Sequence, residues 1–316
     1  MLTILRRSVA FHKTKFKFLR RVNMNPLNDV RIGVVVLALS TFQVPAQVLF
    51  SDGFEGYAAG GSYLDKNIAG PNSAPNGSGN PWFGPFPPNL VVVGTTGSVS
   101  PHGGNNMVRG VLPGDVDQDW VNIAYRFNGG SPFTGNLMFD WWFYDPSGPG
   151  DSNFRDYGVL GFYNTAPNNT DYPGSGSLNS GVSQLQRLSL GAFNPAGFDS
   201  TKYQVRVGGA TDGLTGGWFN TSITRSVGWH EGRIALGSAL GDGTTTVSFF
   251  IDNMITPVLT HNSVTANGYN VLELNGDAGS TTGYFDDVSL SLIPEPGAAA
   301  LLVCGGLTWL TLRRRK

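Results

Sequence analysis

The chain has 316 residues, of which 14% are charged, 12% are aromatic and 44 are glycine. Residues 47–293 carry 20 Asp and Glu against 9 Lys and Arg, a net charge of −11 that the remaining, mostly basic residues hide in the whole-chain value of −1. An acidic surface repels phosphate backbones, which excludes nucleic acid as the expected partner. The single cysteine is Cys304, so residues 47–293 must be held together by a hydrophobic core without disulfides.

The first 46 residues have the organisation of a signal peptide. A basic segment at 6–21 precedes an apolar stretch at 32–42, and Ala46 ends a small-residue site suited to signal peptidase. Cleavage is expected after Ala46. Because the basic leader is long, Met24 is an alternative translation start, and residues 1–46 do not enter the fold prediction.

Residues 47–293 read as short strands joined by turns rich in Gly, Asn and Pro. No stretch there sustains the apolar stripe of a helix. The residues from Gly60 to Pro88 are expected to form a long loop pinned by aromatic side chains. The predicted strands are, in order, one from Val48 to the turn at Asp52-Gly53, then 90–93, 107–111, 120–127, 137–144, 155–164, 185–193, 203–207, 229–236, 244–251, 270–274 and 283–292.

The strand at 137–144 is apolar on both faces, which predicts a central position in its sheet with both sides covered. The region shows no internal repeat and no linker that would divide it. So many short strands in one undivided domain predict an all-β fold, a large antiparallel β-sandwich spanning residues 47–293.

The C-terminal residues 294–316 have three parts: Pro294, Glu295 and Pro296, then an uncharged apolar helix at 297–312, then Arg313, Arg314, Arg315 and Lys316. An apolar segment followed by basic residues is typical of a membrane stop with its tail in the cytoplasm. Its 16 residues are fewer than the roughly 20 that span a bilayer. We therefore expect only a short or transient passage through the inner membrane.

This three-part layout resembles the PEP-CTERM sorting signal of Gram-negative bacteria. The resemblance implies that an exosortase cuts near residues 294–296, after export across the inner membrane and removal of the signal peptide by signal peptidase. The mature protein would then reside at the cell surface or outside the cell.

Two pairs of motifs within residues 47–293 carry a second resemblance. Gly228-Trp229-His230 is followed by Val247–Asn253, and the opening Asp52–Glu55 is matched by the closing Tyr284–Val288. Both pairs resemble laminin-G-like and concanavalin A-like jelly rolls, and the second also resembles several carbohydrate-binding modules. The resemblance implies a jelly-roll form of the sandwich.

A calcium site is one hypothesis for the place where the first and last strands meet. In a closed jelly roll these strands often lie side by side, which would bring Asp52 and Glu55 toward Asp286 and Asp287. Ca²⁺ takes six to eight oxygen ligands. By the resemblance, Glu55 and Asp287 would be side-chain ligands of a structural Ca²⁺, with Asp52 or Asp286 and main-chain oxygens completing the shell. The alternative is that these carboxylates cap turns and face water.

Aromatic side chains on sugar-binding sandwiches stack against pyranose rings. Trp82, Trp142, Tyr144 and Trp218 are candidates, and Trp82 and Trp218 are the preferred ligand-binding residues because their surroundings read as loops. The alternative, that Trp141 or Trp142, and Trp229, belong to the core, is the expectation for these three.

Catalysis finds little support in the sequence. The Glu-x-Asp-x-x-Glu signature of concanavalin-type glucanases is absent, and the three glutamates of this region, Glu55, Glu231 and Glu273, are far apart. No zinc-ligand spacing of histidines, Gly-x-Ser-x-Gly elbow or P-loop occurs. The expected function is therefore a structural or adhesive surface or matrix protein that binds extracellular polysaccharide. The alternative is a divergent polysaccharide-active enzyme, a glycoside hydrolase or lyase.

The sorting-signal hypothesis predicts that the mature protein ends near Pro294–Pro296. Intact-mass measurement of the protein from a host with an active exosortase should therefore lack Arg313–Lys316, and deleting the exosortase should restore them. A mature mass that includes those residues in the exosortase-positive host would contradict the hypothesis.

Overall fold

The computed structural model describes residues 46–57, 62–63, 82–83, 90–110, 120–128, 131–152, 154–163, 184–193, 197–209, 217–265, 268–277 and 283–293. All belong to one compact unit, Pro45–Pro296. The predicted apolar segments at 32–42 and 297–312 and the sorting residues 294–296 and 313–315 lie outside the described residues. Within the described ranges the chain forms strands and turns without an α-helix, and no helix there could cross a membrane.

The strands confirm the predicted all-β class. They are β1 (Gln47–Asp52), β2 (Ser62–Tyr63), β3 (Trp82–Phe83), β4 (Leu90–Val93), β5 (Met107–Gly110), β6 (Trp120–Arg126), β7 (Leu137–Asp145), β8 (Asp156–Tyr163), β9 (Gln184–Ala192), β10 (Lys202–Gly209), β11 (Gly217–Thr224), β12 (Gly228–Leu236), β13 (Thr244–Ile251), β14 (Leu259–Thr265), β15 (Val271–Asp277) and β16 (Tyr284–Leu292).

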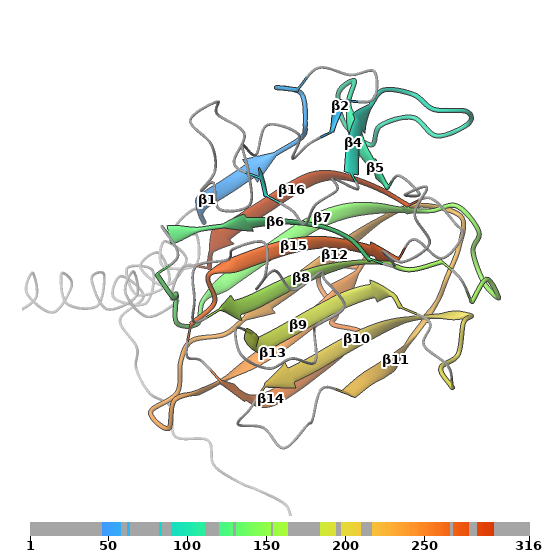
Figure 1. Ribbon diagram of the computed structural model, residues 1–316. Coiled ribbons are helices and arrows are strands. Elements are labelled where there is room, and N and C mark those ends of the chain that lie inside the picture. The colour runs from blue at the N-terminus through green and yellow to red at the C-terminus, as the bar shows by residue number, and fades with distance from the viewer. Residues whose placement is uncertain are drawn as a thin grey trace, which may run out of the picture. The chain divides into compact units, whose positions relative to one another are not determined.

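Two antiparallel sheets pack face to face, as Figure 1 shows. The larger, nine-stranded sheet has the order β14-β13-β12-β7-β16-β5-β4-β2, with β1 also paired to β16. The smaller, seven-stranded sheet has the order β11-β10-β9-β8-β15-β6-β3. Apolar residues of both sheets form one shared core, so the architecture is the predicted β-sandwich.

The prediction missed β2, β3, β11 and β14. The first two have only two residues each and leave no periodic pattern. The other two form the outer edges of their sheets, where the sequence is rich in Thr, Ser and Asn. Because an edge strand is less enclosed by neighbours, it needs fewer apolar residues than a central one.

The strands at the ends of the domain are neighbours, as expected for a closed sandwich. β1 pairs antiparallel with β16, and Asp52 lies opposite Val288. The aromatic strand β7 is central, between β12 and β16, as its two apolar faces predicted. Its inward residues are fully buried and its outward ones are mostly half-buried.

Trp141 on β7 fills the middle of the core between two glycines. Gly232, its cross-strand partner on β12, would place a Cβ 2.6 Å from the indole, and a Cβ on Gly158 of the smaller sheet would also overlap it. The absence of side chains at these two positions therefore makes room for the largest core residue. Glycine serves packing here as well as turns.

Replacing Gly158 by Ala should lower the free energy of unfolding by about 1–3 kcal/mol, because the new methyl group overlaps the rigid, buried indole of Trp141. Urea unfolding of the purified protein measures this loss. Gly241→Ala is the matched control, because nothing lies within 4 Å of a Cβ there. The packing argument fails if the two variants unfold at the same urea concentration.

Candidate functional site

The outward side of the smaller sheet carries a cluster of polar side chains, here called the polar face: Tyr157, Arg187, Ser189, Arg206, Glu273 and Asn275. Successive residues of a strand point to opposite sides. Because Leu160, Leu188, Val205 and Leu272 belong to the shared core, the alternate positions on the same strands point away from the larger sheet. Four strands, β8, β9, β10 and β15, thus contribute to the polar face.

One row of directly opposed residues crosses this side of the sheet. The register places in line Trp218, Arg206, Ser189, Val159 and Glu273, one from each of β11, β10, β9, β8 and β15. At about 4.8 Å between neighbouring strands, the row is about 19 Å long. Ser189, Val159 and Glu273 are fully buried, whereas Trp218 and Arg206 are half-buried, so a ligand could reach the row only at its β11–β10 end.

The polar face is buried although it lies on the outward side of its sheet. Tyr157, Ser189, Glu273 and Asn275 are fully buried, and Arg187 is 3% exposed. The amide of Asn275 donates a hydrogen bond to Glu273 Oε2 at 2.8 Å. Buried polar groups in proteins are normally hydrogen-bonded, and this contact satisfies part of the face from within the protein.

Arginine is the main cation of this face. Arg187 Nη2 donates to the Tyr157 hydroxyl at 3.4 Å, and its Nε donates to Ser189 Oγ at 3.3 Å. Burial raises the pKa of the Tyr157 hydroxyl. Burial and the charge of Arg187 lower the pKa of Arg206 to about 10, so Arg206 still carries its charge at neutral pH.

Aromatic rings flank the polar residues. Trp218 stacks on Phe193, with centroids 4.3 Å apart and planes at 7°, and meets Tyr157 edge-on at 5.3 Å. Arg155 places its guanidinium 5.4 Å from the Phe193 ring. Trp218 was expected on a loop, but it lies on the edge strand β11, half-buried. The glycines before it resembled a turn, yet Gly217 pairs with Val207 of β10.

Trp82 was predicted to bind ligand from a loop, and the structure places it in the core. It lies on β3, is 0% exposed, and packs against Phe50, Phe54 and Tyr125. Its indole Nε1 donates to Asp52 Oδ2 at 2.7 Å. Because small and polar residues surround Trp82 in the sequence, this segment lacks the alternating apolar pattern that predicts a core strand.

The four acids predicted to bind calcium lie near the β1–β16 junction, and each accepts local hydrogen bonds. Asp52 accepts from the backbone of Phe54 and from the Tyr57 hydroxyl, both at 2.8 Å, in addition to Trp82. It therefore anchors an aromatic cluster beneath the first turn.

The other three acids hold the segment 102–106. Glu55 Oε1 accepts from the backbone nitrogens of Asn105 and Asn106, both at 2.8 Å. Asp286 accepts from the nitrogen of Gly103 at 3.1 Å. Asp287 Oδ2 lies 2.7 Å from His102 Nδ1.

Two glycines bring these acids close together. A Cβ on Gly103 would lie 2.6 Å from Asp287, and one on Gly104 would overlap Glu55. Burial, and then the charge of Asp287, raise the pKa of Asp286 to about 6. In the part of the chain that the structure describes, no group of three or more His, Cys, Asp or Glu is arranged to hold a metal ion.

The outward side of the larger sheet carries the remaining candidate aromatics. Trp142 stacks on His102 at 3.5 Å, and Trp229 donates from its indole to the carbonyl of Ser100 at 2.9 Å. Tyr144 meets Trp229 edge-on at 5.5 Å. These rings are half-buried, and they hold the segment 100–106 against the sheet. Trp142 and Trp229 therefore lie outside the core in which they were expected, because they point outward from β7 and β12, whereas Trp141 is a core residue.

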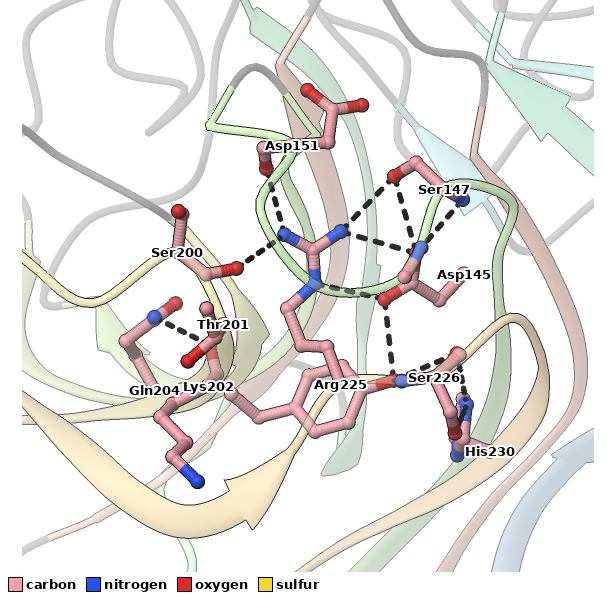
Figure 2. A network of polar contacts seen from close by, with 12 residues as sticks. Asp145, Ser147, Asp151, Ser200, Thr201, Lys202, Gln204, Arg225, Ser226 and His230 are labelled. Carbon is pink, nitrogen blue, oxygen red and sulfur yellow. Dashed lines mark hydrogen bonds and ion pairs between the residues drawn. The ribbon is translucent and has the colours of Figure 1, made fainter.

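Arg225 and Asp145 form a buried ion pair that connects the two sheets, as Figure 2 shows. Both side chains are 0% exposed, and Arg225 Nε lies 2.8 Å from Asp145 Oδ2. The guanidinium also donates to the carbonyls of Asp151 and Ser200 and to Ser147 Oγ, at 2.7, 3.1 and 3.1 Å. With its donors satisfied, this arginine serves the structure and is not a ligand-binding group.

His230 stands between Ser226 and Asp252 in an arrangement that superficially suggests a catalytic triad. Its Nδ1 lies 2.9 Å from Asp252 Oδ2, but its Nε2 is nearer to the carbonyl of Ser226, at 2.8 Å, than to the hydroxyl, at 3.4 Å. A carbonyl only accepts, so Nε2 carries a proton and cannot take one from Ser226.

The surroundings of His230 agree with this structural role. Burial opposes protonation, but the hydrogen bonds to Asp252 and Ser226 and the nearby carboxylates outweigh it and raise the pKa of His230. His230 thus links Ser226 to Asp252 within the fold.

Comparison by sequence finds no matching protein-family model and no matching curated protein. Among solved structures, the chain is similar to an endo-1,3-β-glucanase from Streptomyces sioyaensis, at 15% identity and a TM-score of 0.42 over 80% of this chain and 100% of that one. It is also similar to a pseudo β-1,3-glucanase of Mycobacterium tuberculosis, at 13% identity and a TM-score of 0.42. That match covers 78% of this chain and 99% of the other.

A third similar structure is the binding domain of botulinum neurotoxin serotype G, at 9% identity and a TM-score of 0.35. The match takes in 68% of this chain and only 46% of that one. At TM-scores below 0.5 none of these similarities establishes a detailed shared fold. The assignment of the sandwich and of its polar face is based on the strands and side chains of this chain alone.

Asp145→Asn should destabilise the protein by about 3–5 kcal/mol, because it leaves the buried charge of Arg225 without its counterion. Asp242→Asn is the control: it removes one negative charge from an exposed turn and should change stability by no more than about 0.5 kcal/mol. Equal denaturation midpoints for the two variants would show that the ion pair does not stabilise the fold.

Proposed function

We propose that this chain is an exported surface or matrix protein, structural or adhesive, that binds polysaccharide at the β10–β11 edge of the polar face of a concanavalin-like or laminin-G-like jelly roll. The pair of half-buried side chains Trp218 and Arg206, directly opposed on β11 and β10, is the observation that carries this proposal. It sets an aromatic ring beside a guanidinium.

Sugars match that combination of groups. Their hydroxyls accept hydrogen bonds, which the half-buried Arg206 can donate. The apolar side of a pyranose ring packs on aromatic surfaces, which the half-buried Trp218 can provide.

Export and C-terminal processing belong to the same proposal. They are supported by the signal-peptide pattern at 1–46 and the three-part tail at 294–316. The acidic, disulfide-free domain between them would remain outside the cell after exosortase cleavage.

A structural Ca²⁺ at the β1–β16 junction is a further part of the proposal. Glu55 and Asp287 both contact the segment 102–106, through hydrogen bonds to Asn105 and Asn106 and to His102. These two would be the side-chain ligands, with main-chain oxygens and water completing the six to eight that Ca²⁺ takes. The ion would tie the segment 102–106 to both ends of the domain.

Trp218→Ala should weaken polysaccharide binding about tenfold, because it removes the ring against which a sugar would stack. Affinity electrophoresis of the purified protein against a polysaccharide panel measures the change. Trp229→Ala, a half-buried tryptophan on the other sheet, is the matched control and should bind like the wild type. Binding that survives in Trp218→Ala at full strength contradicts the assignment, and release of reducing ends would indicate an enzyme.

Added Ca²⁺ should raise the thermal midpoint of the wild-type protein, because an ion that binds only the folded state stabilises it by mass action. Glu55→Ala should abolish that increase, whereas Glu231→Ala, a glutamate on the outward side of β12, should keep it. Calorimetry with and without Ca²⁺ gives both results. A wild-type midpoint that does not respond to Ca²⁺ would remove the ion from the proposal.

A further inference from the structure

Arg206 is a cation on the polar face without a counterion among the described residues. It is half-buried, and its Nε is enclosed without a hydrogen-bond partner. None of the ion pairs between described residues includes it. A buried charge is costly unless it is paired, so a guanidinium held in this way needs an explanation.

The surroundings of Arg206 make its charge less favourable still. Arg187, on the neighbouring strand β9 and diagonal to it in the register, is a second cation, and its charge helps to lower the pKa of Arg206. Arg187 is held in place by Tyr157, both through the hydroxyl and through a cation–π contact at 5.6 Å. Like charges held close together in a partly buried site are typical of functional sites.

The distribution of charge over the domain adds a second, independent argument. Residues 47–293 contain only 9 Lys and Arg against 20 Asp and Glu. Three of those cations, Arg155, Arg187 and Arg206, lie on this one side of the smaller sheet. Glu273 is an acid of the same face, and the three arginines outnumber it, so the balance of charge there favours anions.

We infer that the polar face selects polysaccharides with carboxylate groups on their sugar units. The planar fork of a guanidinium matches a carboxylate in bidentate geometry. Arg206 lies directly opposite Trp218, so a sugar ring against Trp218 would place its acidic substituent beside the arginine. The inference rests on the proposed polysaccharide site and specifies its ligand class.

The test compares polygalacturonate with uncharged dextran as ligands of the purified full chain. The wild type should prefer polygalacturonate, and Arg206→Gln should weaken that binding about tenfold while leaving any dextran binding unchanged. Arg206→Lys should recover part of the affinity. Lys202→Gln, an equal loss of charge near the start of the same strand, where the ammonium donates to Thr224 Oγ1 at 2.7 Å, should bind like the wild type.

Thermal stability distinguishes a ligand-binding arginine from a purely structural one, because the loss of a structural arginine lowers the thermal midpoint. Because Arg206 lacks a counterion and is repelled by Arg187, Arg206→Gln should leave the thermal midpoint unchanged or raise it. A marked fall in the midpoint would show that Arg206 serves the fold, which would overturn the inference.

The outcomes separate the inference from the proposed function. If dextran binds as tightly as polygalacturonate in a Trp218-dependent way, the site is a polysaccharide site without acid selectivity, and only the inference fails. If neither polymer nor any of the panel binds, the proposed function fails as well. Dextran sulfate that binds as tightly as polygalacturonate and is insensitive to Arg206→Gln would show general charge attraction, which also overturns the inference.

Discussion

The ion pair between Arg225 and Asp145 is the interaction on which the arrangement of the two sheets depends. Asp145 ends β7 of the larger sheet, and Arg225 follows β11 of the smaller one. Two fully buried charges are expensive to remove from water, and they are tolerated only where the geometry is good and the remaining donors are satisfied. Here the arginine reaches both carboxylate oxygens, at 2.8 and 3.1 Å, and two backbone carbonyls. The pair therefore fixes β10 and β11, which carry Arg206 and Trp218, against the central strand of the other sheet.

The two sides of the smaller sheet differ in chemistry because they have different tasks. The inward side contributes leucines and valines to the shared core, whereas the outward side is buried yet polar. Its packing also uses glycine: Gly191 has φ +149° and lies opposite Tyr157, where a Cβ would come within 2.6 Å of the Tyr157 Cα. A residue with a side chain could not occupy that position without displacing the tyrosine. The high glycine content thus supports the core and the polar face as well as the turns.

Periodicity predicted most of the strands because each inward residue must be apolar, and a period of two is visible within a single segment. It failed for the edge strands β11 and β14, whose polar sequences carry little of that signal. For the same reason, Trp82 and Trp218, the two preferred ligand-binding tryptophans, were wrongly predicted to lie on loops. Trp82 lies in the core beside Asp52, and Trp218 lies on an edge strand. The contact of Trp82 with Asp52 and the pairing of Trp218 with Arg206 leave no local pattern, because each joins two separate strands.

The sequence by itself determined the all-β class, the acidic charge of the domain and the hypothesis that its two ends are targeting segments, because composition, alternation and tripartite order are local properties. The meeting of the first and last strands was also predictable, from the motifs that open and close the domain. Only the tertiary structure decided that Arg187, Arg206, Trp218 and Glu273 share one side of a sheet. They come from four strands, and the hydrogen-bond register that aligns those strands depends on contacts between distant segments. The individual residues were visible in the chain, but their assembly into one site was a product of the fold.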